Sequence, residues 1–161
     1  MIDYKIIEID DSNIQAIVDM VERNDEEFVR IPKKTIARWA DGTNKFDGPG
    51  EKLWGVFDGA KCIATGGLSH DPYLDDKTVG RVRGIYVDPE YRKHGLAKIL
   101  LHLVIDRAKV NFLRLRLGTT NPVAAEIYKS FGFVYVGEMD EKQTYEIKDV
   151  RNYEYPANLV K

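Results

Sequence analysis

A strand-to-helix junction near the middle of the 161-residue chain carries residues suited to binding an anion. An apolar stretch, Val82 to Val87, runs into Asp88-Pro89, and R-K-H-G-L-A at positions 92–97 then opens an amphipathic helix. Gly95 and Ala97 are small, so a ligand can approach the backbone closely there. The first amides of a helix have no partner inside the helix, and the helix dipole adds positive charge at that end. The junction therefore predicts a binding site for a phosphate group.

A second group of residues follows one helix and one strand later, from Asn121 to Phe133, and reads N-P-V-A-A-E-I-Y-K-S-F-G-F. Asn121 before Pro122 is a good helix N-cap, because its side chain can accept a hydrogen bond from a free backbone amide. Tyr128 lies seven residues further on, so it shares a helical face with the nearby Ala124 and Ala125.

Together, the two groups resemble the GNAT superfamily of N-acetyltransferases. The spacing R-x-x-G-x-A after an apolar strand is similar to the family's acyl-CoA pyrophosphate loop, and Asn121, Tyr128 and the turn Phe131-Gly132-Phe133 are similar to its second signature. The resemblance implies an enzyme that transfers the acetyl group of acetyl-CoA directly to a primary amine of a small molecule or peptide. Acetyl-CoA would then be a co-substrate, and no metal is expected.

The resemblance also implies roles for single residues. Tyr128 is expected to be the general acid that protonates the departing CoA thiolate, since a phenol (pKa about 10) keeps its proton more firmly than a thiol (about 8.5). The amide of Asn121 could reach a pantetheine carbonyl, while His94 contributes its backbone amide rather than a base. The strand 82–87 is expected to splay from its parallel neighbour, 112–117, and to pair with the pantetheine arm. The residues expected to bind acetyl-CoA are Ile85, Tyr86, Val87, Arg92, Lys93, His94, Gly95, Leu96, Ala97, Lys98, Asn121 and Tyr128.

Each of these assignments has a purely structural alternative. Asn121 could serve only as a cap, and a buried Tyr128 would ordinarily be a core aromatic whose hydroxyl finds one partner. The strand could be an ordinary core strand, and the cations around the loop could be solvated surface residues.

The general base is the part of the mechanism that the sequence leaves open. Family members often carry a Glu on the strand before the loop, but Arg81 to Val87 contains no carboxylate. His70, Asp71, Asp75 and Asp76 are candidates, although Asp71 to Asp76 is better interpreted as a hydrated turn. A backbone carbonyl with an ordered water could serve instead.

The acceptor is open for a similar reason. Arg81 and Arg83 would favour a substrate with a carboxylate, whereas acidic residues would favour a cationic amine. Two other classes of function also compete with the transferase: a non-catalytic acyl-CoA-binding sensor or partner module, and a structural domain with a phosphate-binding turn. The acidic residues that would favour a cationic amine are Glu26, Glu27, Asp75 and Asp76. The aromatic residues that could line the acceptor site are Phe28, Trp39, Trp54 and Tyr73. The two Trp residues are more typical of a core.

Composition limits the remaining classes. Apolar residues make up 43% and charged residues 31%, and the formal net charge is −2, so neither nucleic acid nor an anionic membrane is favoured as a partner. The single Cys62 excludes an internal disulfide and a cysteine-based zinc site. Neither a signal peptide nor an apolar run of about 20 residues is visible, so we expect a cytoplasmic protein. Members of the family often form dimers, which makes a homodimer a further expectation.

The pattern of elements predicts one α/β domain over residues 1–161, with a mixed, mostly antiparallel sheet flanked by helices. A strand (4–9) precedes two helices, one starting at Asp11 or Ser12 and ending near Asn24, the other running from Pro32 to Asp41-Gly42. Two strands meet at Asp58-Gly59, a strong hairpin signal. The remaining predicted elements are a strand at 79–87, a helix at 95–109, a strand at 112–117, a short helix from Asn121 to Gly132, a strand at 133–138 and a last strand within 145–155.

Overall fold

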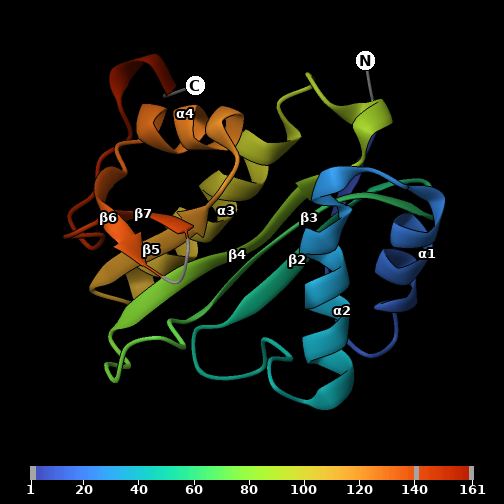
Figure 1. Cartoon of the computed structure of the whole chain (residues 1–161), viewed down its shortest axis with the longest axis horizontal. Coiled ribbons are helices and arrows are strands. Elements are labelled where there is room, and N and C mark those ends of the chain that lie inside the picture. Colours follow the sequence, from blue (N-terminus) through green and yellow to red (C-terminus); the bar gives the residue numbers. More distant parts are fainter. Residues whose placement is uncertain (1–2, 140–141, 160–161) are drawn as a thin grey trace. The chain divides into compact units, whose positions relative to one another are not determined.

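The computed structural model of the chain describes residues 3–139 and 142–159. Its elements follow the predicted order of one strand, two helices, three strands, helix, strand, helix and two strands (Figure 1). They are β1 (Lys5–Glu8), α1 (Gln15–Arg23), α2 (Arg30–Asp41), β2 (Lys52–Asp58), β3 (Lys61–His70), β4 (Val79–Val87), α3 (Leu96–Asn111), β5 (Arg114–Thr119), α4 (Pro122–Ser130), β6 (Val134–Met139) and β7 (Lys142–Ile147), with short 3-10 turns η1 (Glu27–Val29), η2 (Pro89–Tyr91) and η3 (Ala157–Leu159).

The strands form one sheet in the order β1-β2-β3-β4-β5-β7-β6. β4 and β5 run parallel, and the pairs β1–β2, β2–β3, β5–β7 and β6–β7 are antiparallel. The predicted mixed, mostly antiparallel sheet with a central parallel pair is therefore confirmed. The register of β4 on β5 covers three residue pairs, from Val79–Arg114 to Arg81–Arg116. The further expectation that this pair splays stays a prediction.

The chain divides into two compact units, which are described separately. The first unit contains residues 1–69 and 82–104, and the second contains residues 70–81 and 105–161. β4 and α3 each contribute residues to both. Among the described residues, no helix combines the length and apolar character needed to cross a bilayer.

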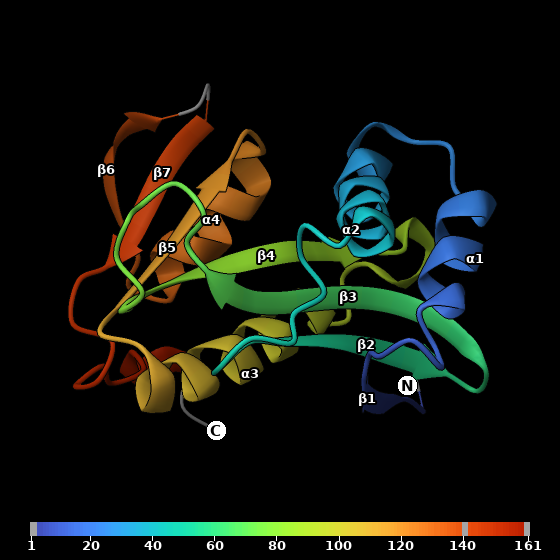
Figure 2. The ribbon, with the colours of Figure 1, turned by 90° about the horizontal axis from the view of Figure 1, so that it is seen from below.

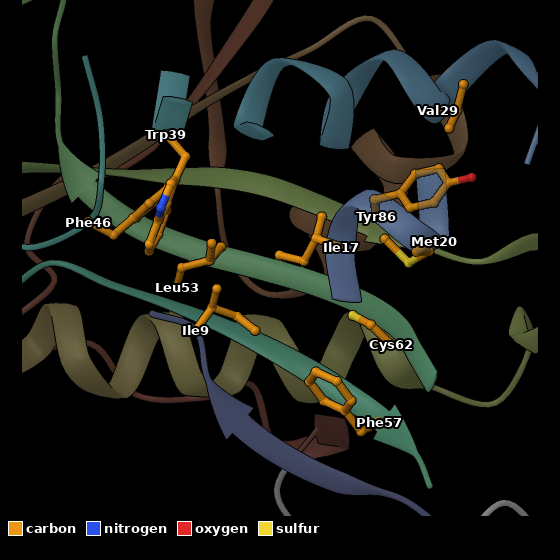
Figure 3. Close-up of a cluster of buried hydrophobic side chains, with 10 residues drawn as sticks. All are labelled: Ile9, Ile17, Met20, Val29, Trp39, Phe46, Leu53, Phe57, Cys62 and Tyr86. Atoms are coloured by element: carbon orange, nitrogen blue, oxygen red, sulfur yellow. The ribbon is translucent and has the colours of Figure 1, made fainter. Parts of the chain in front are cut away.

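In the first unit, helices cover both faces of the strands. Figure 2 shows α1 and α2 over one face of β2 and β3, with the beginning of α3 against the other. Gly66 of β3 lets α3 approach, because a Cβ atom there would lie 3.2 Å from the Cβ atom of Leu100. The hairpin turn at Asp58-Gly59 is confirmed, and Gly59 has the positive φ of 62° that such a turn requires. A core of buried side chains between α1, α2 and the strands includes Ile17, Met20, Trp39, Leu53 and Tyr86 (Figure 3).

The two helices of this unit show one correct and one wrong boundary. α2 ends at Gly42, in the left-handed conformation at φ 79°, as predicted. The prediction that Asp11 or Ser12 caps α1 is wrong, since α1 begins at Gln15 and its N-cap residue makes no side-chain hydrogen bond. Asp11 instead accepts a hydrogen bond from the indole Nε1 of Trp39, 2.8 Å away. The carboxylate that the local sequence pattern assigned to the helix cap is therefore bonded to a residue 28 positions away.

In the second unit, the two faces of the half-sheet β5-β7-β6 differ in chemistry. Leu115 pairs with Ile147 and Leu117 pairs with Tyr145, which gives one face a buried apolar layer. The alternate residues form a polar face with Arg116 opposite Glu146. The last strand begins at Lys142 and ends at Ile147, earlier than the predicted stretch of 145–155. The segment after it is fixed by side chains: Tyr155 donates a hydrogen bond of 2.7 Å to Asp106.

Candidate functional site

The predicted phosphate loop lies in the first unit, between η2 and α3. Lys93 and Gly95 both adopt the left-handed conformation, at φ 69° and 77°. This backbone turns the chain sharply into α3, whose first hydrogen bond runs from the Ile99 amide to the Gly95 carbonyl (3.1 Å). A Cβ atom at Gly95 would meet no heavy atom within 4 Å among the described residues outside the adjoining backbone. The helix N-terminus therefore faces open space, and the donor set of backbone amides fits a diphosphate.

The side chains of the loop leave this terminus accessible. Arg92, Lys93, His94 and Lys98 are exposed, while Ala97 is half-buried. The Leu96 side chain is 2% exposed and belongs to the core, so only its backbone amide is available to a ligand. The loop is consequently open to solvent and is not filled by its own residues.

Arg92 differs from the two lysines because its guanidinium has partners inside the protein. Its Nε donates a hydrogen bond of 3.0 Å to the carbonyl of Val87. Its Nη2 donates to the Glu26 carboxylate, and its guanidinium carbon lies 5.5 Å from the centre of the Tyr86 ring. Of the basic residues around the loop, Arg92 is thus held by other residues of the protein, while Lys93 and Lys98 are exposed.

The strand before the loop is irregular at a point that the sequence could have signalled. Gly84, in the middle of β4, has a φ of 60°. Its carbonyl accepts a hydrogen bond of 2.9 Å from the Thr65 hydroxyl, and a Cβ atom at Gly84 would lie 2.9 Å from the Thr35 hydroxyl. A lone glycine inside a strand pattern indicates an irregularity of this kind, but the strand prediction overlooked it. Beyond Gly84, Ile85 and Val87 are half-buried and Tyr86 is 3% exposed.

Asn121 lies in the second unit, where its capping role is confirmed. Its side-chain Oδ1 accepts hydrogen bonds from the amides of Val123 (3.0 Å) and Ala124 (3.4 Å) at the start of α4. Its own backbone amide donates to the Thr119 hydroxyl at 3.0 Å. The side-chain oxygen is therefore committed to the helix, and the group suited to a pantetheine carbonyl is the Nδ2 amide.

Tyr128 is buried on α4, with 8% of its surface exposed. Its ring packs edge-on against Phe133, with 5.9 Å between the ring centres. Burial raises the pKa of Tyr128 above its ordinary value, because the phenolate would be poorly solvated. The phenol consequently keeps its proton at neutral pH. This protonation state is compatible both with a core aromatic residue and with a general acid.

Two of the four candidate bases have structural roles in the second unit. The Asp71 side chain is fully buried, and its Oδ2 lies 3.1 Å from Nη1 of Arg81. Its Oδ1 accepts a hydrogen bond of 2.8 Å from the Tyr73 amide. Asp76 accepts hydrogen bonds from the amide and hydroxyl of Thr78, which hold its pKa below the usual value. The turn is therefore structural, as interpreted from the sequence, but Asp71 is not hydrated.

The other residues considered for catalysis or for the acceptor are distributed between core and surface. His70 packs edge-on against Phe112 with ring centres 5.1 Å apart, and Asp75 is exposed. Trp39 and Trp54 are each 8% exposed and are core residues, as favoured from the sequence. Tyr73 is 48% exposed, and its ring lies 4.7 Å from the guanidinium of Arg81. Within residues 3–139 and 142–159, no three His, Cys, Asp or Glu side chains come together as metal ligands would.

Comparisons with known proteins identify the family. The model of the acetyltransferase (GNAT) family matches residues 14–133. The N-terminal acetyltransferase B complex catalytic subunit NAA20 from Arabidopsis thaliana is 31% identical over 117 residues, which cover 65% of this chain. The match covers 62% of that relative, so the chain spans less than two thirds of its length.

Solved structures show the same fold. A candidate acetyltransferase from Exiguobacterium sp. 255-15 has a TM-score of 0.72 at 23% identity, covering 91% of this chain and 94% of that one. The PaiA N-acetyltransferase from Thermoplasma acidophilum, solved in complex with coenzyme A, has a TM-score of 0.64 at 16% identity, covering 91% and 99%. The family match spans more than half of the sequence, and the chain therefore belongs to the GNAT family of acyl-CoA-dependent acetyltransferases, whose co-substrate is acetyl-CoA.

Proposed function

We propose that this protein transfers the acetyl group of acetyl-CoA directly to a primary amine of a small molecule or peptide. The observation that carries the proposal is the exposed loop between η2 and α3, which ends in a left-handed Gly95 with open space beside it. Its free backbone donors and two exposed lysines suit the diphosphate of coenzyme A. The name of the plant relative, an N-terminal acetyltransferase subunit, supports an amine as acceptor.

In the proposed reaction, the amine nitrogen attacks the carbonyl carbon of the thioester, so a C–N bond forms while the C–S bond breaks. The sulfur departs as a thiolate and takes the phenolic proton of Tyr128. A proton donor at this point lowers the barrier, because an unprotonated thiolate would leave as an anion that a buried site solvates poorly. Asn121 is proposed to donate its Nδ2 hydrogen bond to the pantetheine arm, and Ile85, Tyr86 and Val87 to contribute backbone contacts to it.

The amine must lose a proton as it is acylated, and we weigh the candidate bases by the contacts that each one makes. Asp71 is held in a buried ion pair with Arg81, which accepting a proton would break, and the hydrogen bonds from Thr78 lower the pKa of Asp76. His70, Asp75 and a water on a backbone carbonyl are the alternatives that stay open. We propose that one of these, rather than a carboxylate on β4, receives the proton.

Direct transfer needs no acyl-enzyme, and Cys62 supports this. Its side chain is fully buried in β3, and burial raises the pKa of its thiol to about 12. A nucleophilic cysteine requires the opposite, a lowered pKa and access to substrate.

The experiment that tests the proposal is a thiol-release assay with acetyl-CoA and a panel of amines. The panel contains polyamines, amino acids, aminoglycoside-type amines and short peptides with free N-termini. Since the single cysteine is buried, a thiol reagent reports the CoA product alone. We expect thiol release that depends on at least one amine and an acetylated amine in the product. Binding of coenzyme A with no release across the panel would support a non-catalytic acyl-CoA sensor instead.

A further inference from the structure

The corner between α1 and α2 holds the chain segment that leads into the loop. Two residues of this corner, Arg23 and Glu26, form ion pairs with Asp88 and Arg92, which lie just before the loop. The charges are arranged in opposite senses, because the corner supplies the cation of one pair and the anion of the other. All four residues belong to the first unit.

The first pair fixes the end of β4. Asp88 is 2% exposed, and its Oδ2 accepts hydrogen bonds of 3.3 Å from Arg23 and from Asn24. Its Oδ1 accepts a further bond of 3.1 Å from the Glu90 amide, and its own amide donates to the carbonyl of Ile63 at 2.8 Å. The turn at Asp88-Pro89 is therefore anchored to α1 and to β3.

The second pair fixes the start of the loop. The Glu26 carboxylate accepts hydrogen bonds from the Arg92 guanidinium, from the Tyr86 hydroxyl (3.2 Å) and from the Phe28 amide. Its side chain is 24% exposed and that of Arg92 is 41% exposed, so the pair is only partly screened by water. Arg92 is also bonded to the Val87 carbonyl, and thus three contacts hold its guanidinium in place.

Arg92 is the last residue before the left-handed Lys93, at which the exposed loop begins. A residue that fixes the side chain of Arg92 fixes the point from which the loop departs. Burial alone would raise the pKa of Glu26, but the hydrogen bonds from Arg92 and Phe28 outweigh it and leave the pKa below its ordinary value. Glu26 is thus ionised at neutral pH and keeps hold of Arg92.

We infer, on the basis of the proposed function, that Glu26 is a positioning residue for acyl-CoA binding. Glu26 holds the Arg92 guanidinium, and Arg92 in turn fixes the start of the loop and does not itself bind the diphosphate. Under this inference the diphosphate is bound by backbone amides and by Lys93 and Lys98. Arg92 contributes by keeping Val87 and the loop in the geometry that presents those amides.

The substitution Glu26→Gln tests whether Arg92 positions the loop or binds phosphate, because the two roles predict opposite changes in the affinity for coenzyme A. If Arg92 bound phosphate directly, releasing it from a competing carboxylate would strengthen the binding of coenzyme A. The inference predicts the opposite, a dissociation constant for coenzyme A about tenfold higher, the size expected when one charge-assisted hydrogen bond that orders the site is lost. The KM for acetyl-CoA should rise in parallel while the KM for the amine stays unchanged.

Glu27→Gln is the matched control, because Glu27 is the exposed neighbour of Glu26 and has the same side chain. It should leave the dissociation constant as in the unmodified protein. A thermal melt of each variant shows whether it is folded at the assay temperature. Should Glu26→Gln be unfolded, Tyr86→Phe decides the question, because it removes one hydrogen bond that holds the Glu26 carboxylate and leaves the Arg92 guanidinium intact. We expect it to bind coenzyme A severalfold more weakly, whereas direct phosphate binding by Arg92 would leave the affinity unchanged or raise it.

Unchanged or tighter binding of coenzyme A by Glu26→Gln, or by Tyr86→Phe where Glu26→Gln is unfolded, would overturn the inference. These results are distinct from a failure of the proposed function, which would show as no binding of coenzyme A by the unmodified protein.

Discussion

The guanidinium of Arg81 lies 3.1 Å from the carboxylate of Asp71, and both side chains are almost entirely removed from solvent. The Tyr73 amide donates to the second oxygen of the same carboxylate, and the Tyr73 ring covers the guanidinium. A carboxylate with these partners is a structural anchor for the turn between β3 and β4. It is poorly placed to accept a proton during catalysis, because protonation would break a buried ion pair.

Replacing Asp71 by Ala should therefore destabilise the protein strongly. Breaking a buried pair on one side leaves an uncompensated charge, and we expect the free energy of unfolding to fall by about 3–5 kcal/mol. Urea denaturation measures this, with Asp75→Ala, at an exposed position of the same turn, as control. A fully stable Asp71→Ala variant that has lost turnover would instead mark Asp71 as the base.

Tyr128→Phe should lower kcat by about a hundredfold, the lower end of what general acid catalysis contributes, and leave the affinity for coenzyme A nearly unchanged. Tyr135→Phe, at a half-exposed position on β6, serves as control. Steady-state kinetics with a calorimetric titration of coenzyme A separates the two quantities. An unchanged kcat would remove Tyr128 from the chemistry.

The pH dependence of kcat follows from the same residue. Tyr128 must be protonated to act as the acid, and burial raises its pKa above the ordinary 10.0. The enzyme should therefore lose activity through deprotonation of Tyr128 only above pH 10. A pH–rate profile of the unmodified enzyme with a fast acceptor should show no alkaline decline from this group below that pH. A decline near pH 8 that disappears in Tyr128→Phe would contradict the raised pKa.

Gly95→Glu should abolish the binding of coenzyme A, because a carboxylate would occupy and repel the proposed diphosphate position. The left-handed backbone also costs a side chain about 1–2 kcal/mol, so a matched strain control is needed. Gly59→Glu supplies it, since Gly59 has a similar φ of 62° and equally open surroundings in the β2–β3 turn. Loss of binding in both variants, or in neither, would argue against the assignment of the loop.

Asn121→Ser separates the two roles of Asn121. A serine hydroxyl can still accept from the Val123 and Ala124 amides, so the stability of the protein should stay nearly as it was. It has no Nδ2 amide to offer, and the affinity for coenzyme A should fall if the proposed pantetheine contact exists. Asn121→Ala should lose both, with about 1 kcal/mol of stability. Equal affinity in all three proteins would leave Asn121 with the cap alone.

Cys62→Ala should keep its turnover, since direct transfer does not use a thiol. In the unmodified protein, iodoacetamide at pH 8 should leave Cys62 unlabelled until urea unfolds the chain, because the thiol is buried with a pKa of about 12. Mass spectrometry reads both the labelling and any acetylated protein formed with acetyl-CoA. An acetyl group retained on Cys62 would contradict direct transfer.

The features that the sequence predicted well are those encoded by neighbouring residues. The strand ending at Val87, the helix after Gly95, the cap at Asn121 and the hairpin at Gly59 each follow from a few adjacent positions. Contacts between segments that are distant along the chain could not be predicted from the sequence. Glu26 meets Arg92 across 66 positions, and neither residue type nor spacing marks that pair.

The same limit explains the errors. Asp11 has the right chemistry for a cap at the start of α1, but Trp39 competes for it from another helix. Asp71 looks like part of a hydrated polar turn, and only the position of Arg81 on β4 shows that the turn folds inward. The signal for the left-handed backbone at Gly84 was present as a lone glycine in a strand and could have been used.

We propose above all that the backbone amides after Arg92 bind the diphosphate of coenzyme A. A nitrogen–proton correlation titration of the labelled protein with coenzyme A measures this at each amide. We expect the largest chemical-shift changes at the amides of Lys93 to Lys98, and their saturation should give the same dissociation constant as calorimetry. Saturable binding that leaves those amides unshifted would contradict it.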